Sequence, residues 1–97
     1  MRIIAKRTLR EFWEEHPDAQ DALEAWFARA SHAQWEKPAD IFQDFANVSL
    51  LNDNRVCFNI GGNKYRLIVY INYTYFTIYI RFIGTHSEYD DIDANTI

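Results

Sequence analysis

The chain has 97 residues, of which 48% are hydrophobic and 16% aromatic, and its formal net charge is −4. This length fits one domain with a modest core, which we expect to span residues 1–97. The single cysteine, Cys57, excludes an internal disulfide, zinc-ligand spacing is absent, and no run approaches the ~20 apolar residues of a membrane span. The start is too charged for a secretory signal, so we expect a cytoplasmic protein without membrane contact.

The net negative charge argues against a nucleic-acid binder, but the charge is distributed unevenly. Residues 1–47 hold nine acids and six bases, residues 48–87 hold one acid and four bases, and residues 88–97 hold four acids. Positive charge is therefore concentrated in the middle of the chain. We expect one face to attract an anionic ligand, while binding to free nucleic acid stays weak.

The N-terminal half predicts a short strand at residues 1–5 followed by a helical hairpin. Thr8 and Glu11 match a capping box, which predicts a helix from Thr8 to about His16. Pro17 can open a second helix, which should end at Lys37-Pro38 because the residue before proline avoids the helical region. Its apolar stripe would cover one face of the sheet, and its members are Ala22, Leu23, Trp26, Phe27 and Ala30.

The connection from this hairpin to the sheet contains one more predicted turn or short helix at residues 39–45. Ile41, Phe42 and Phe45 should point inward from it, and residues 51–54 should form a loop. His16 and His32 stand among polar neighbours, so we expect both on the solvated surface.

Residues 55–83 predict three strands joined by two tight turns. Gly61-Gly62 and Asn72-Tyr73 each suit a two-residue turn. The first turn would place Phe58 opposite Tyr65, and the second would place Val69 opposite Phe76. Both turns give the same two faces, one of them apolar and suited to pack on helices: Val56, Phe58, Ile60, Tyr65, Leu67, Val69, Ile71, Phe76, Ile78, Ile80 and Phe82.

The other face combines cations with aromatic side chains: Arg55, Cys57, Asn59, Lys64, Arg66, Ile68, Tyr70, Tyr75, Thr77, Tyr79, Arg81 and Ile83. A solvated sheet face normally alternates polar with apolar residues, and this explanation is preferred for any single position. The four cations, however, have no carboxylate among them, and like charges on adjacent strands repel. This set of residues therefore predicts an anionic ligand.

The polar segment after the last predicted strand contains His86 and Tyr89. Thr85 and Glu88 match a capping box, so a capped helical turn is one explanation and a reactive site the other. The two are compatible, because a cap fixes where the side chains point. Strand-borne cations can neutralise a phosphate, histidine or tyrosine can move a proton, and tyrosines can stack on bases. Few acids lie near the sheet, so we expect no metal cofactor.

Several segments resemble the HigB family of toxins from bacterial toxin–antitoxin systems, and the similarity covers nearly the whole chain. They include RVCFNIGGNKYRLIVYINY, YIRFIGTHSEYDDID, REFWEEHPDA, AWFARA and WEKPADI. The resemblance implies a RelE-like α+β fold, with an antiparallel-rich sheet of about four strands and an N-terminal helical hairpin on one face. It implies a metal-independent mRNA endoribonuclease that acts on the translating ribosome and so inhibits growth. It also implies a HigA-type helix-turn-helix antitoxin that binds the toxin. The toxin would contact operator DNA only indirectly, through this antitoxin.

By position, the resemblance assigns the catalytic site to Lys64, Arg66, Arg81, His86 and Tyr89. We expect the three cations to hold the scissile phosphate and His86 to act as general acid or base. Tyr89 would orient the nucleotide or share the proton transfer.

Three further residues, Arg55, Asn59 and Tyr79, would extend the RNA path along the sheet. Two alternatives stay open. The first is a noncatalytic protein that binds RNA or an antitoxin and cuts nothing. The second is a gyrase poison, whose mark would be DNA-damage signalling.

Overall fold

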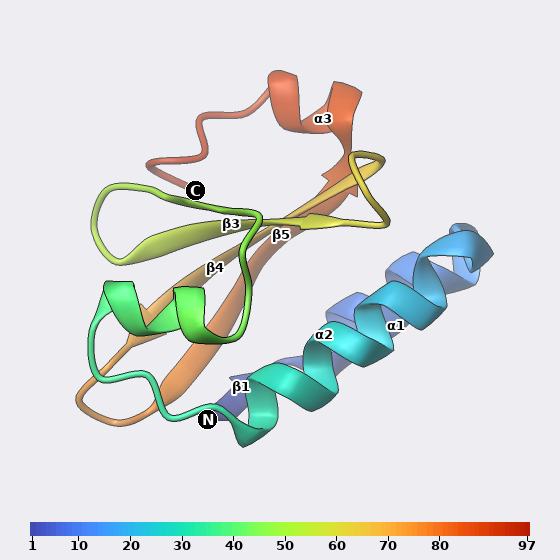
Figure 1. The fold of residues 1–97 in the computed structure, drawn as a ribbon. Coiled ribbons are helices and arrows are strands. Elements are labelled where there is room, and N and C mark those ends of the chain that lie inside the picture. Colours follow the sequence, from blue (N-terminus) through green and yellow to red (C-terminus); the bar gives the residue numbers. More distant parts are fainter.

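The computed structural model describes residues 1–97 as a mixed sheet with a helical hairpin on one face and a short helix beyond the other (Figure 1). The sheet order is β1-β5-β4-β3-β2, with β1 parallel to β5 and the other neighbours antiparallel. The α+β class is confirmed, although the sheet has five strands where about four were predicted. No helix is long and apolar enough to cross a membrane. The elements are β1 (Arg2–Ile4), α1 (Lys6–Glu15), η1 (Pro17–Ala19), α2 (Gln20–His32), η2 (Pro38–Gln43), β2 (Val48–Leu50), β3 (Arg55–Ile60), β4 (Tyr65–Asn72), β5 (Thr77–Thr85) and α3 (His86–Asp90).

The predicted helix boundaries are partly wrong. Helix α1 begins at Lys6 with Ala5 as its N-cap, so Thr8 lies inside the helix and forms no capping box. Pro17 opens a short 3-10 turn before α2, as proline at a first helical position should. Helix α2 ends at His32, well before Pro38. The chain leaves the helix early and buries Trp35, whose indole N–H donates to Asp44 Oδ2 at 2.8 Å.

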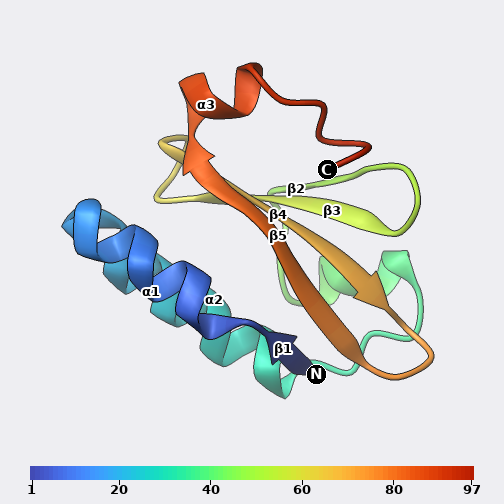
Figure 2. The same cartoon turned by 180° about the vertical axis from the view of Figure 1, so that it is seen from behind.

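The main core lies between the helical hairpin and the sheet (Figure 2). It contains 17 buried residues contributed by both helices, by η2 and by β3, β4 and β5. Trp26 and Phe45 both pack edge-on against Phe58, with ring centroids 5.4 and 5.1 Å away. Ile41 is fully buried as predicted, but Phe42 is 49% exposed, so the prediction that it points inward was wrong.

The turn between β3 and β4 is longer than predicted. Gly61 and Gly62 have φ values of 63° and 70°, which glycine adopts without a Cβ clash, but the loop also includes Asn63 and Lys64. Phe58 therefore pairs with Leu67 and not with Tyr65. The register is shifted by two, and the faces survive because side chains alternate with a period of two.

The turn between β4 and β5 is also longer, and it spans residues 73–76. The Asn72 side-chain oxygen accepts the Tyr75 backbone N–H at 3.2 Å, and Phe76 has a φ of 50°. Val69 consequently pairs with Ile80, whereas the sequence predicted Phe76 as its partner. The exposed loop thus holds residues that we expected in a strand.

A β-bulge at Arg81 changes the faces of the last part of β5. Val69 pairs with Ile80, but the next pair joins Ile68 to Phe82, so Arg81 has no partner across the ladder. Beyond the bulge, Phe82 shares the face of Ile68 and Ile83 shares the face of Leu67. The predicted faces of Phe82 and Ile83 were therefore wrong.

Helix α3 and the segment that follows it fold back over the second face of the sheet (Figures 1 and 2). They bury Cys57 and Ile68 together with Ala94 in a small second cluster. This face is therefore partly covered, where the sequence predicted an open one. The partly buried residues packed around the cluster are Leu51, Phe82, Tyr89, Ile92 and Ile97.

Candidate active site

Helix α3 is fixed at the end of β5 by two sets of hydrogen bonds. The predicted capping box forms: Glu88 N–H donates to Thr85 Oγ1 at 3.2 Å, and Thr85 N–H donates to Glu88 Oε1 at 2.8 Å. The bond from the Thr85 N–H, with the Thr85 side chain second, lowers the pKa of Glu88, because donors to the carboxylate favour its ionised form. His86 N–H also donates to the Lys64 carbonyl at 3.2 Å, which ties the helix to the start of β4.

Arg66 and Tyr89 meet at this junction. The Arg66 guanidinium carbon lies 5.9 Å from the centre of the Tyr89 ring, and Arg66 Nη1 donates to the Asn63 carbonyl at 3.0 Å. Burial, with the neighbouring Cys57 second, raises the pKa of Tyr89, so its phenol keeps its proton and can donate a hydrogen bond. The guanidinium is thus held in place by neutral partners.

His86 stands next to a carboxylate on its own helix. Its Nδ1 lies 3.1 Å from Asp90 Oδ2, and both side chains are more than half exposed. His86, Tyr89 and Asp90 are three and four residues apart, so they share one side of α3. The Arg66–Tyr89 contact therefore lies on the side of α3 that also carries the imidazole.

A second cationic cluster surrounds Tyr70. The guanidinium carbons of Arg55 and Arg81 lie 5.8 and 5.7 Å from the centre of its ring, and the Tyr79 ring is 6.1 Å away. Arg55 Nε also donates to the main-chain oxygen of Ile97 at 2.9 Å. No Asp or Glu side chain pairs with either arginine, nor with Arg66.

The two clusters are separated by Ile68. Arg66 and Tyr70 are four residues apart on one face of β4, about 13 Å at the usual rise of a strand. Ile68, between them, is fully buried beneath the C-terminal segment. Arg81 was predicted to converge with Arg66, but its guanidinium lies at Tyr70 instead. The register of β5, which pairs Tyr79 with Tyr70, and the bulge at Arg81 together place it there.

Lys64 also lies elsewhere than predicted. It is in the loop before β4, and its Nζ lies 3.1 Å from Asp18 Oδ2 at the start of the second helical segment. Asp18 accepts a hydrogen bond from the Tyr65 hydroxyl as well, and this bond, with Lys64 second, lowers the pKa of Asp18. Lys64 is thus paired with a carboxylate on the helical side. Its pair is exposed, so separating the two charges costs little.

Of the remaining predicted residues, Asn59 lies near the end of β3, where it pairs with Arg66 across the ladder. Its amide donates to Asn47 Oδ1 at 2.8 Å. His16 was expected in solvent, but its ring stacks on Phe12 at 4.2 Å and packs edge-on against Tyr65. His32 is exposed, as predicted.

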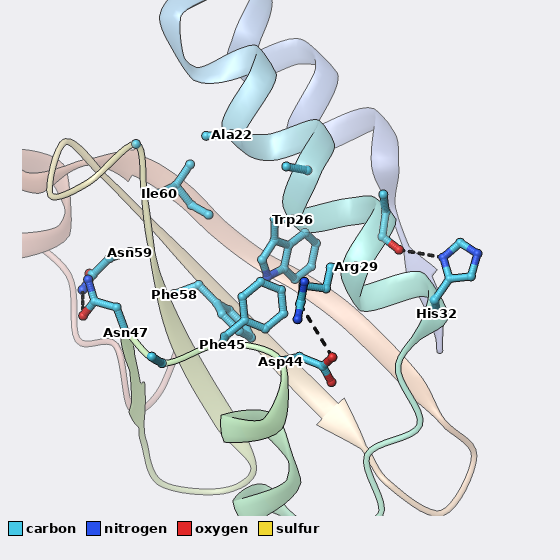
Figure 3. Close-up of a pocket in the computed structure, with 14 residues that line it drawn as sticks. Ala22, Trp26, Arg29, His32, Asp44, Phe45, Asn47, Phe58, Asn59 and Ile60 are labelled. Carbon is cyan, nitrogen blue, oxygen red and sulfur yellow. Dashed lines mark hydrogen bonds and ion pairs between the residues drawn. The ribbon is translucent and has the colours of Figure 1, made fainter.

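The largest hollow of the molecule is on the opposite face, between α2 and β3 (Figure 3). It is a groove of about 870 Å³ with Phe45 and Phe58 at its floor and the Arg29–Asp44 ion pair at its side. None of the arginines of the two clusters lines it. The candidate site is therefore an open surface, which suits a long polymer better than a small molecule.

Two residues of these clusters were missed in the sequence. Tyr70 was placed on the correct face but was not assigned to a site. Asp90 was not assigned a role, although its spacing of four from His86 within a capped helical turn is the spacing at which helical side chains meet.

Comparison with known proteins agrees with this architecture. A family model described as HigB toxin, RelE-like toxic component of a toxin-antitoxin system, matches residues 19–92. The mRNA interferase toxin HigB of Escherichia coli (strain K12) is 29% identical over 97 residues, which cover 97% of this chain and 92% of that protein. The mRNA interferase HigB of Escherichia coli O6:H1 is 26% identical over 94 residues, with 95% and 91% covered.

The fold and the site together define a small α+β protein with arginines on the sheet face opposite its helical hairpin and a histidine on the short helix after β5. The family match extends over most of the chain, from α2 through α3. The chain belongs to the HigB toxin family, the RelE-like toxic components of toxin–antitoxin systems.

Proposed function

We propose that this protein is the toxin of a type II toxin–antitoxin pair and cleaves mRNA by metal-independent transesterification. The observation that carries the proposal is the contact of Arg66 with Tyr89 on α3, the helix that also carries His86 and is bonded through the His86 N–H to the Lys64 carbonyl. The names of the relatives, mRNA interferases, support the substrate.

The reaction needs only groups that this chain supplies. A base removes the proton of a ribose 2′-hydroxyl, the 2′-oxygen forms a bond to phosphorus, and the bond from phosphorus to the 5′-oxygen breaks. The leaving oxygen takes up a proton. The products are a 2′,3′-cyclic phosphate and a 5′-hydroxyl, and neither water nor an oxidant is consumed.

Each residue at the junction has a role in this scheme. Arg66 holds the phosphate and neutralises its nonbridging oxygens, because a guanidinium fork matches their geometry. His86 transfers the proton, because an imidazole can both take and give a proton in general acid–base catalysis. Tyr89 donates a hydrogen bond to the nucleotide or to the leaving oxygen. Lys64 reaches the phosphate after it leaves Asp18, because an exposed ion pair costs little to separate.

The cluster around Tyr70 extends the RNA path. Unpaired bases stack on aromatic rings, and each stack is worth ~1–3 kcal/mol. Arg81 and Arg55 bind phosphates on either side of the stacked base, and Tyr79 widens the platform. Asn59 lies at the rim, where its amide can exchange Asn47 for RNA.

The overall charge of −4 makes tight binding to free RNA unfavourable, so we propose that the substrate is mRNA on the ribosome. We further propose a cytoplasmic location and neutralisation by a HigA-type helix-turn-helix antitoxin. Operator DNA would be reached only through that partner.

Primer extension on a message, in a purified translation system, tests these statements. We expect new RNA ends when ribosomes are present, and fewer or none on the same message without ribosomes. To test metal independence, preformed ribosome–mRNA complexes are washed, treated with EDTA and resupplied with a nonreactive polyamine before the toxin is added. We expect the same RNA ends under that condition. Absence of new ends in all conditions would favour the noncatalytic binder. DNA-damage signalling without RNA cleavage would favour the gyrase poison.

A further inference from the structure

Asp90 forms a polar contact with the proposed catalytic histidine. Asp90 Oδ2 is 3.1 Å from His86 Nδ1, one helical turn away on α3. An ionised carboxylate has only acceptors, so the proton of this hydrogen bond must be on Nδ1. The neutral imidazole then has its lone pair on Nε2.

We propose that Asp90 is a positioning residue that holds His86 in the Nδ1–H tautomer and so presents Nε2 as the general base. This inference rests on the proposed nuclease function. It names the atom that takes the 2′-hydroxyl proton and the carboxylate that stabilises the imidazolium formed by that transfer.

The surrounding structure makes the contact a defined one. The first turn of α3 is fixed by the Thr85–Glu88 capping box and by the bond from His86 N–H to the Lys64 carbonyl. The backbone of both partners therefore belongs to a short, anchored helix. A carboxylate four residues after a histidine on such a helix reaches one ring nitrogen and leaves the other free.

The other charged groups near His86 do not duplicate this role. The Glu88 carboxylate accepts the hydrogen bond from the Thr85 N–H. The charge of His16 is a minor cause of the lowered pKa of Glu88. Lys64 directs its ammonium to Asp18, away from α3. Arg66 is the cation next to the helix, and its guanidinium contacts the Tyr89 ring.

The order of proton movement follows from this geometry. Nε2 takes the proton from the 2′-hydroxyl while the bond from the 2′-oxygen to phosphorus forms. The ring becomes an imidazolium with Nδ1–H still donated to Asp90. The same proton can return from Nε2 to the leaving 5′-oxygen or to solvent, so the enzyme ends the cycle unchanged.

Two substitutions of Asp90 and one matched control test the proposal. Asp90→Asn removes the charge but keeps the size, and Asp90→Glu keeps the charge. Asp91→Asn removes a neighbouring exposed carboxylate that makes no contact with His86. We expect Asp90→Asn to slow cleavage by roughly tenfold to a hundredfold, less than the ~10²–10⁴-fold that a general acid or base itself contributes. We expect partial rescue in Asp90→Glu and no change in Asp91→Asn.

The tautomer provides a readout independent of activity. In ¹⁵N NMR spectra of the full chain, we expect the His86 ring to carry its proton on Nδ1 in the wild type and in Asp91→Asn, and to shift toward Nε2–H in Asp90→Asn. The rising limb of the pH–rate profile should also move to lower pH in Asp90→Asn, because the imidazolium loses its anion.

Three results would overturn the inference, and they are distinct from failure of the proposed function. The first is wild-type cleavage in Asp90→Asn while His86→Gln is inactive, and the second is slower cleavage with an unchanged tautomer and pH profile. The third is an Nε2–H tautomer in the wild type. Wild-type cleavage in His86→Gln would remove the proposed catalytic site as a whole.

Discussion

The two faces of the sheet differ in what their side chains do. The face under the helical hairpin contributes to a core of 17 buried residues, whereas the other face buries a cluster of three beneath α3 and the C-terminal segment. The arginines that pair with no Asp or Glu side chain lie around that small cluster. The same three strands thus supply stability on one side and unneutralised charge on the other.

The difference indicates that stability and activity can be separated by the face that a substitution touches. Side chains in the main core should affect unfolding first. Side chains at the junction of β4 and α3 should affect cleavage with little effect on unfolding. Variants for unfolding experiments are best made in the inactive His86→Gln background, because a toxin limits its own expression.

The largest expected effect is on the helix face. Phe58→Ala removes a ring that is 1% exposed and packs against Trp26 and Phe45, so we expect a loss of ~3–5 kcal/mol in the free energy of unfolding. Urea denaturation measures it. Phe42→Ala, at a phenylalanine that is 49% exposed, is the matched control and should cost far less. Equal losses would contradict the assignment of the core.

On the opposite face, Arg66→Ala should reduce cleavage by ~10²–10³-fold, the usual effect of losing one donor to a charged transition state. Its free energy of unfolding should change by no more than about 0.5 kcal/mol, as for a surface substitution. Rates are measured by primer extension, with Arg10→Ala on the exposed side of α1 as the control. Unchanged cleavage in a soluble Arg66→Ala variant would remove the proposed phosphate site.

Lys64 lies in the loop between the two faces of the sheet. Its substitution shows whether it binds the phosphate or only pairs with Asp18 on the helical side. If the ammonium leaves Asp18 to bind the phosphate, Lys64→Ala should lower the cleavage rate by about tenfold, equivalent to one charge-assisted hydrogen bond. Asp18→Asn, which frees the ammonium, should not lower it. A drop in thermal stability with an unchanged rate in Lys64→Ala would assign Lys64 to the helix side alone.

A smaller effect is expected at Tyr73, whose buried hydroxyl has no hydrogen-bond partner. Burial raises the pKa of Tyr73 to about 12, with Asp40 a lesser cause. Tyr73→Phe should stabilise the protein by ~1 kcal/mol and raise Tm by a few degrees. In the wild type, a raised tyrosine pKa gives stability that is present below pH 10 and lost as the pH rises toward 12, so the variant should resist alkaline unfolding better. A lower Tm in the variant would contradict an unpaired hydroxyl.

The smallest effect is a pH dependence. The Tyr65 hydroxyl and then Lys64 lower the pKa of Asp18 below its usual 3.8. A lowered carboxyl pKa contributes stability above the unfolded-state value, and this stability is lost as the pH falls through the folded-state value. Asp18→Asn should therefore be slightly less stable at pH 7 and show a shallower decline below pH 4, as measured by thermal melts between pH 2 and pH 7. Parallel curves for the two proteins would contradict the linkage.

The sequence predicted the two faces of β3 and β4 because alternation survives an even shift in register, as at Phe58 and Leu67. It failed at Phe82 and Ile83, because nothing in the local pattern marks the bulge at Arg81. It also missed the hairpin between β2 and β3, whose turn uses Asp53 and Asn54 at φ 54° and 61° without glycine.

The sequence predicted where the candidate site lies better than it predicted which residues form it. His86 and Tyr89 follow from a capping box that can be read directly. Lys64 and Arg81 could not be placed, because their directions depend on a loop length and on a bulge. The cover over Cys57 and Ile68 depends on where α3 sends the chain afterwards, and this is a tertiary outcome with no periodic signal.

The most direct test of the central claim is to map RNA ends in cells after brief induction of the wild type and of soluble His86→Gln. The account predicts new ends within translated regions for the wild type and a background pattern for the variant, while both proteins melt at similar temperatures. New ends in both strains, or in neither, would contradict a nuclease site at the junction of β4, β5 and α3.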